Sequence, residues 1–95
     1  MVASGPVGAG FDAALMVRRT AQGDQQAWER LVDHYAGSIW AITRDFKLSE
    51  SQAHDVSQTT WLRLLEQIDR LDHAAGVGSW LAATARDECL RKRGD

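Results

Sequence analysis

AHDVSQTTWLRLLEQIDRL, residues 53–71, is the stretch that decides the fold, because its apolar side chains repeat at helical spacing from end to end. The repeating positions are separated by three or four residues: Ala53, Val56, Thr60, Leu64, Ile68 and Leu71. This spacing predicts a single helix that buries one stripe. The start of the helix is also marked, since Ser49 or Ser51 can cap it and Glu50 adds a favourable negative charge to the first turn.

The same helix carries more apolar surface than one buried stripe needs. Trp61, Leu62 and Leu65 widen the apolar arc, while polar side chains occupy most other positions, namely Asp55, Gln58, Arg63, Glu66, Gln67 and Arg70. Two interpretations stay open for Trp61. Either it fills a corner of the core, or the widened arc binds another helix or a partner protein.

A second helix is predicted upstream by the most regular apolar pattern in the chain. Its apolar positions step by three or four residues: Trp28, Leu31, Tyr35, Ile39, Ile42 and Phe46. Asp24 is placed to cap its start. Because only residues 47–49 join this helix to the next, we expect the two helices to pack as antiparallel neighbours.

The N-terminal part is predicted to hold a disordered segment and a short helix. Residues 1–11 are rich in glycine and other small residues, so we expect them to be disordered. The short helical pattern extends to Gln22, with Asp12 as its N-cap and Gly23 as its C-terminal stop. We therefore expect one helical domain over residues 12–95.

After the decisive stretch we expect a loop and a fourth helix. Residues 72–76 have no periodicity, and Ser79 is a candidate N-cap. The expected buried side of this helix is Trp80, Leu81, Thr84 and Ala85, and its far end carries the cations Arg86, Arg91, Lys92 and Arg93. We expect the core to include Trp28, Tyr35, Ile39, Leu64, Ile68, Trp80 and Leu81.

Composition favours an all-α protein. The single proline is Pro6, and no strand-like alternation or Asn-Gly or Asp-Gly turn follows it. We therefore predict a compact bundle of about four helices in one domain. No apolar run approaches the roughly 20 residues of a membrane span, and we see no secretory signal, so we expect a cytoplasmic protein without a membrane partner.

The single cysteine, Cys89, cannot form an internal disulfide, which fits a reducing, cytoplasmic environment. Neighbouring cations such as Arg86 and Lys92 could lower the pKa of its thiol and make it reactive. A buried thiol would instead be inert, and this is the interpretation that we favour.

The charge distribution points to one end of the chain. The net charge of −2 argues against a general nucleic-acid binder. Residues 1–75 hold seven Lys/Arg against ten Asp/Glu, whereas residues 76–95 hold four against three. Any contact with phosphates should therefore come from the last helix. On charge alone, we favour the interpretation that its cations only complement the helix macrodipole.

No pattern in the sequence is typical of an enzyme. His34, His54 and His73 are scattered, without a second ligand at a metal-binding spacing. The glycines among the first ten residues precede no strand, unlike those of a phosphate-binding loop. We expect no catalytic residues, no metal and no cofactor.

Two segments resemble region 2 of the sigma-70 family, in its compact extracytoplasmic-function branch: HDVSQTTWLRLLEQIDRL (54–71) and VGSWLAATARDECLRKR (77–93). The family's third helix has a pattern that is matched here by Asp55, Val56, Gln58, Trp61, Leu62 and Leu64. The helix that follows is matched by Trp80, Leu81, Ala85 and Arg86, with Asp87 in place of the usual Asn. Together with GDQQAWERLVDHYAGSIWAIT (23–43), the resemblance covers about residues 12–94.

The resemblance implies a non-enzymatic transcription initiation domain that binds the β′ clamp helices of RNA polymerase core and recognises and helps melt the promoter −10 element. The residues implied to bind polymerase are Asp55, Gln58, Trp61, Leu62 and Glu66. Those implied to contact the single-stranded non-template DNA strand are Asp72, His73, Trp80, Arg86, Arg91, Lys92 and Arg93. A flipped base would lie against the loop at residues 72–76. The resemblance also admits an anti-sigma factor as a partner.

Such factors also have a helix-turn-helix that reads the −35 element, and this chain would correspond to the other half. The alternative from a different functional class is a helical protein-interaction module without DNA binding. In that interpretation the tryptophan-rich faces bind a partner helix, and the basic end only complements the helix dipole.

Overall fold

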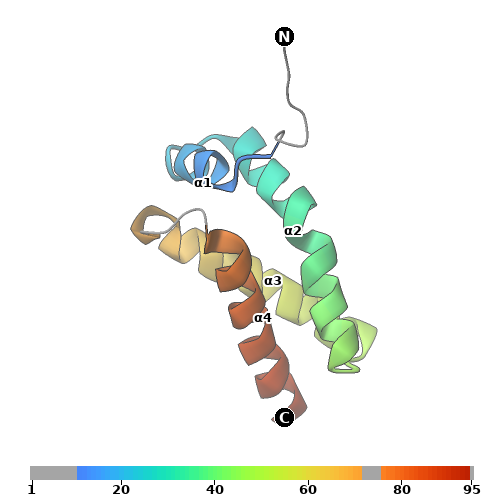
Figure 1. Ribbon diagram of the computed structural model, residues 1–95. Coiled ribbons are helices and arrows are strands. Elements are labelled where there is room, and N and C mark those ends of the chain that lie inside the picture. Colours follow the sequence, from blue (N-terminus) through green and yellow to red (C-terminus); the bar gives the residue numbers. More distant parts are fainter. Residues whose placement is uncertain (1–10, 72–75, 95) are drawn as a thin grey trace.

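The computed structural model describes residues 11–71 and 76–94, and every regular element in this part of the chain is helical (Figure 1). The elements are α1 (Ala13–Ala21), α2 (Gln25–Asp45), α3 (Glu50–Gln67), the 3₁₀ turn η2 (Ile68–Arg70) and α4 (Val77–Gly94). The predicted all-α bundle is therefore confirmed. None of the described helices combines the length and the apolar character that crossing a membrane requires. Most of the predicted disordered segment, residues 1–10, lies outside the described residues.

The predicted helix caps are present. The Asp12 carboxylate accepts from the Leu15 N–H at 3.0 Å at the start of α1, and Asp24 caps α2 in the same way. Ser49 caps α3 in a reciprocal capping box with Gln52. The chain leaves α1 through Gly23 at a φ of 93°, a left-handed conformation that glycine adopts without steric cost.

The start of α4 differs from the prediction. Ser79 lies inside the helix, which begins at Val77, so its assignment as the N-cap was wrong. Val77 is fully buried. Its burial favours a helix that starts earlier than the serine N-cap predicts. Gly78 then allows α4 to approach α2 closely, since a β-carbon there would lie 3.0 Å from the Tyr35 ring.

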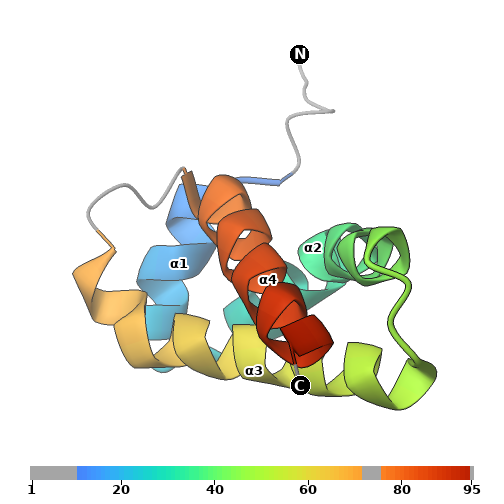
Figure 2. The same cartoon turned by 90° about the horizontal axis from the view of Figure 1, so that it is seen from below.

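The helices are arranged so that the end of α3 returns the chain to the first helix. η2, at the end of α3, lies against α1. α4 then packs across both α2 and α3 and runs to the opposite end of the molecule (Figures 1 and 2). The basic end of α4 is therefore close to the turn between α2 and α3, where the Arg93 guanidinium lies 5.8 Å from the centre of the Phe46 ring.

The core contains most of the expected residues, at different depths. Ile39, Leu64, Ile68 and Leu81 are buried, as predicted. Trp28, Tyr35 and Trp80 are only partly buried and pack against the outside of this cluster. Large aromatic rings reach the edge of a small core even when their helical position points inward, which explains the difference.

Candidate functional site

All five residues expected to bind polymerase lie on the outer side of α3. Asp55, Gln58, Leu62 and Glu66 are exposed, and Trp61 is half-buried. Leu62 is 59% exposed, and Leu65 beside it is 42% exposed. Adjacent exposed leucines are more informative than a single one, because contiguous apolar surface on a small domain often marks a site of interaction.

Three of these residues are brought together in a shallow groove between α2 and α3. The groove has a volume of about 390 Å³ and is lined by Trp28, Val32, Gln58, Trp61, Leu62 and Leu65. The Trp61 ring meets the Trp28 ring edge to face, with centroids 5.6 Å apart and an interplanar angle of 85°. Trp61 therefore both packs at the edge of the core and forms a wall of the groove, so the two interpretations of this residue are compatible.

The sequence did not indicate that residues of α2 would help to form this groove. Trp28 occupies a core position in the apolar pattern of α2, and Val32 lies one turn further along. Periodicity identifies the inward side of each helix separately. It does not identify the edge at which two helices leave apolar surface open between them.

Asp55 lies apart from this groove, nearer the start of α3. It lines a second, open hollow together with Trp40, Glu50, Ser51 and His54. Its Oδ2 accepts a hydrogen bond from the Lys92 ammonium on α4, at 3.3 Å. One residue of the expected polymerase surface is thus paired with one residue of the expected DNA-binding helix.

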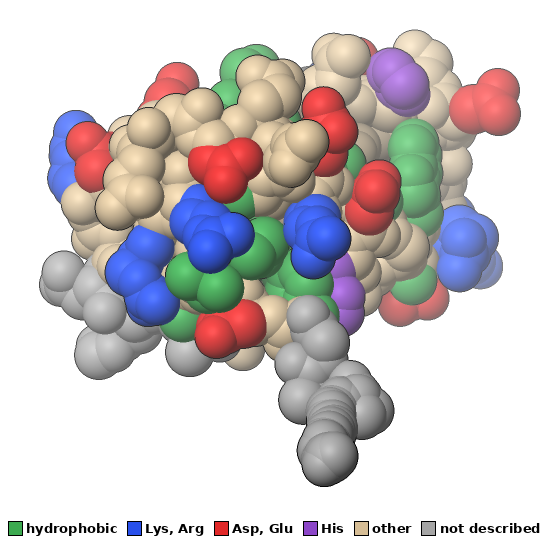
Figure 3. Space-filling model, turned by 90° about the horizontal axis from the view of Figure 1, so that it is seen from above, with side chains coloured by type: hydrophobic (Ala, Val, Ile, Leu, Met, Phe, Trp, Pro, Cys, Tyr) green, Lys and Arg blue, Asp and Glu red, His purple; other side chains and the backbone are tan. Residues whose placement is uncertain are grey.

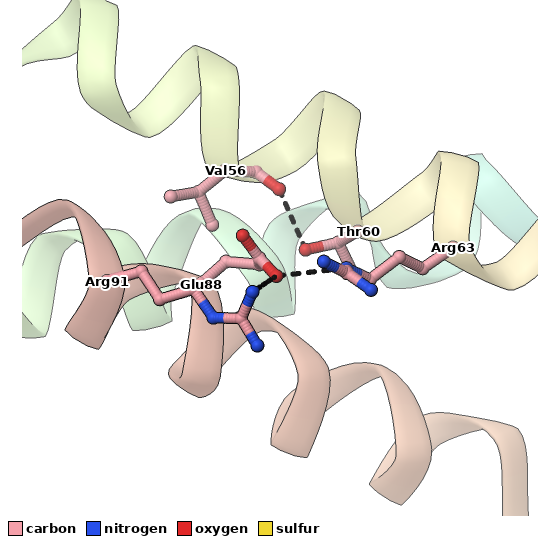
Figure 4. A network of polar contacts seen from close by, with 5 residues as sticks. All are labelled: Val56, Thr60, Arg63, Glu88 and Arg91. Atoms are coloured by element: carbon pink, nitrogen blue, oxygen red, sulfur yellow. Dashed lines mark hydrogen bonds and ion pairs between the residues drawn. The ribbon is translucent and has the colours of Figure 1, made fainter.

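A second polar contact between α3 and α4 is more deeply placed (Figure 4). The Arg63 Nε donates to Glu88 Oε2 at 2.9 Å, and the Glu88 side chain is only 11% exposed. Arg91 approaches the same oxygen at 4.0 Å from the next turn of α4. The sequence placed Arg63 off the buried stripe of α3, and the structure adds that its side chain reaches Glu88 on α4.

Glu88 is buried, which its place in the sequence does not indicate. In the sequence it belongs to a charged run that is typical of a solvated helix end. The structure places it on the inner side of α4, in line with the buried residues Val77, Leu81 and Ala85. Partnership with Arg63 makes this burial tolerable, because an unpaired buried carboxylate would be strongly destabilising.

The four cations of α4 have different surroundings. Arg91 approaches Glu88, Lys92 pairs with Asp55, and Arg93 lies over the Phe46 ring. Arg86 is exposed and forms no ion pair with the described residues. Arg86 and Arg93 are seven residues apart and therefore share one face of the helix.

The remaining residues expected to contact DNA are placed only in part. Trp80 is half-buried and packs against the core, so part of its ring is committed to the fold. Asp72 and His73 lie outside the described residues. At the α1 end of the molecule, acidic and basic side chains are interspersed (Figure 3), in contrast to the grouped cations of α4.

The Cys89 thiol is fully buried, as predicted. Burial raises its pKa, and the negative charge of the adjacent Glu88 raises the pKa further. The predicted alternative, in which neighbouring cations lower the pKa of the thiol, is therefore wrong, because both effects raise this pKa. The thiol stays protonated at neutral pH and is suited to packing rather than to chemistry.

The order of these helices and the pattern of residues on α3 and α4 can be compared with known families. The family model described as Sigma-70 region 2 matches residues 31–95, which is more than half of the chain. The chain belongs to the sigma-70 region 2 family. This finding confirms the resemblance that the sequence indicated, and the match includes the whole of α3 and α4.

A curated relative supports the same family. The protein named RNA polymerase sigma factor NccH, from Alcaligenes xylosoxydans xylosoxydans, is 32% identical over 66 residues. The alignment covers 70% of this chain and 36% of the relative, so the chain spans about a third of the relative's length. No solved structure matches the chain with comparable significance.

Proposed function

We propose that this chain is the part of a transcription initiation factor that binds RNA polymerase core and contacts the single-stranded −10 element of a promoter, helping to melt it. The polymerase surface is the outer side of α3, which would meet the clamp helices of the β′ subunit. The DNA surface is α4 together with the loop before it. The proposed role requires no catalysis by the chain and no cofactor.

The main support for a polymerase-binding surface is the groove between α2 and α3. It offers aromatic and aliphatic side chains, Trp61 and Leu62 among them, with the polar groups of Gln58 beside them. Glu66 lies exposed one turn beyond Leu62. Aromatic and aliphatic anchors surrounded by polar groups are typical of the energetically important centre of a protein interface.

The polymerase part is tested by placing a charge in the groove. We expect Leu62→Glu to weaken binding to RNA polymerase core about tenfold or more, because the carboxylate would be desolvated on docking. Leu62 is 59% exposed, so the substitution should leave the fold intact, which circular dichroism checks. Leu90→Glu is the matched control, since Leu90 is 57% exposed but lies on α4. Equal binding of the two variants would contradict the proposal.

The DNA part is supported by the grouping of cations on α4 and by the family to which the chain belongs. Each phosphate contact adds to the slope of log affinity against log salt concentration. Arg86 should contribute most per residue, because it forms no ion pair within the described residues that binding a phosphate would have to break. Base contacts would come from the loop, in line with the general division between positioning and specifying contacts.

The corresponding test measures promoter-strand binding by the complex with polymerase core over a series of salt concentrations. We expect Arg86→Gln to reduce the slope of log affinity against log salt by about 0.7, the value of one contact to a single strand. Arg18→Gln is the control, since Arg18 is an exposed arginine on α1 and is distant in sequence from α4.

The alternative, a protein-interaction module without DNA binding, has one observation in its favour. Three of the four α4 cations already contact groups within the domain: Arg91, Lys92 and Arg93. If the salt dependence of promoter binding were the same for the Arg86 and Arg18 variants, this alternative would be preferred.

A further inference from the structure

One ion pair joins the two proposed binding surfaces. Asp55 belongs to the polymerase side of α3, and Lys92 belongs to the DNA side of α4, 37 positions further along the chain. We infer that this pair is a latch, which opens when a cationic group of polymerase binds Asp55 and thereby releases Lys92 for a DNA phosphate. The inference rests on the proposed function and concerns its regulation.

The geometry of the pair suits a reversible contact. The Lys92 ammonium and Asp55 Oδ2 are 3.3 Å apart, and their side chains are 33% and 55% exposed. Either group can therefore be reached by a partner from outside. The other bridge between α3 and α4 is different, because the Glu88 side chain is only 11% exposed and is held by Arg63 at 2.9 Å.

Charge makes the two external contacts dependent on each other. A phosphate bound to Lys92 would lie close to the Asp55 carboxylate, and the two negative charges would repel. A cation docked on Asp55 neutralises this carboxylate, so the repulsion is removed and Lys92 is free to turn outward. Occupation of one surface should therefore raise the affinity of the other.

The other cations of α4 do not offer this coupling. Arg91 shares Glu88 with Arg63 and lies on the same helix as its acidic partner. Arg93 lies over the Phe46 ring, which carries no charge for polymerase to neutralise. Arg86 has no ion pair within residues 11–71 and 76–94. Among the four, Lys92 alone is paired with a residue of the proposed polymerase surface.

The latch predicts an unusual result for polymerase binding measured without DNA. Removal of Lys92 frees Asp55, so Lys92→Met should tighten binding to RNA polymerase core about two- to fivefold, in line with the modest strength of exposed ion pairs. Asp55→Asn should weaken binding. In the Asp55→Asn background, Lys92→Met should have no further effect, because there is no carboxylate left to release.

The experiment measures the dissociation constant between labelled 95-residue variants and RNA polymerase core, at low and at high salt. Arg86→Met is the control, because it removes the same charge from α4 without opening an ion pair. The latch is supported if Lys92→Met tightens binding, Arg86→Met does not, and the gain disappears with Asp55→Asn.

The remaining outcomes separate the latch from the proposed function. If the wild-type chain binds core but Lys92→Met is neutral or weakens binding, the latch is wrong and the proposed function stands. If Arg86→Met tightens binding as much as Lys92→Met, net charge explains the gain and the latch is again wrong. If the wild-type chain does not bind core at all, the proposed function fails and the latch fails with it.

Discussion

Two polar contacts join α3 to α4, and they differ in how far each is removed from water. Arg63–Glu88 is short, and its carboxylate is nearly buried, whereas Asp55–Lys92 is longer and lies where solvent reaches both groups. Burial makes the first costly to break, because a carboxylate without a partner cannot recover its hydration. Exposure makes the second easy to exchange for an outside partner. The same pair of helices therefore carries one contact that is costly to break and one that is easily exchanged.

The largest expected effect comes from the buried apolar side of α3. Leu64 is fully buried and Leu62, two residues earlier on α3, is 59% exposed. We expect Leu64→Ala to lower the free energy of unfolding by ~2–5 kcal/mol and Leu62→Ala by less than ~0.5 kcal/mol. Urea unfolding of both variants measures the difference. Equal losses would mean that α3 is rotated relative to the structure.

The next largest effect is expected at the buried Arg63–Glu88 contact. Its cation is replaced by methionine, as in the Lys92→Met variant of the exposed contact. We expect Arg63→Met to cost about 1–3 kcal/mol, because it leaves the Glu88 carboxylate with Arg91 alone at 4.0 Å. This range is below that of a fully buried pair, since the Arg63 side chain is 43% exposed.

A second substitution identifies the cause of that loss. If the penalty comes from the orphaned carboxylate, Glu88→Leu in the Arg63→Met background should recover part of the lost stability. A double variant less stable than Arg63→Met would show that Glu88 stabilises α4 by some other contact.

The smallest expected effect is the stability contribution of the exposed pair. A double-mutant cycle with Asp55→Asn and Lys92→Met should give a coupling free energy of about 0.5 kcal/mol or less at low salt. The coupling should decline further at high salt, since exposed charges are screened. A coupling comparable to that of Arg63 and Glu88 would remove the contrast between the two contacts.

The sequence predicted the helical elements well, because their signals are local. Apolar spacing along residues 53–71, and the caps Asp12, Asp24 and Ser49, depend on residues within one or two turns of each other. The same local reasoning failed at Ser79, where the burial of Val77 against other helices decided the start of α4. It also placed Trp28 inside the core, although only the packing of α2 against α3 shows that one side of its ring stays open.

The sequence by itself determined the family and the helical fold. It also determined that α3 carries the excess apolar surface and that α4 carries the grouped cations. Only the tertiary structure decided which of these charges face each other. In the sequence, Glu88 is one member of a charged run, and Asp55 and Lys92 lie on different predicted surfaces. Packing of α4 across α3 buries Glu88 and pairs Asp55 with Lys92. The physical reason is that periodicity fixes a side chain's direction on its own helix, whereas its partner depends on the crossing of two helices.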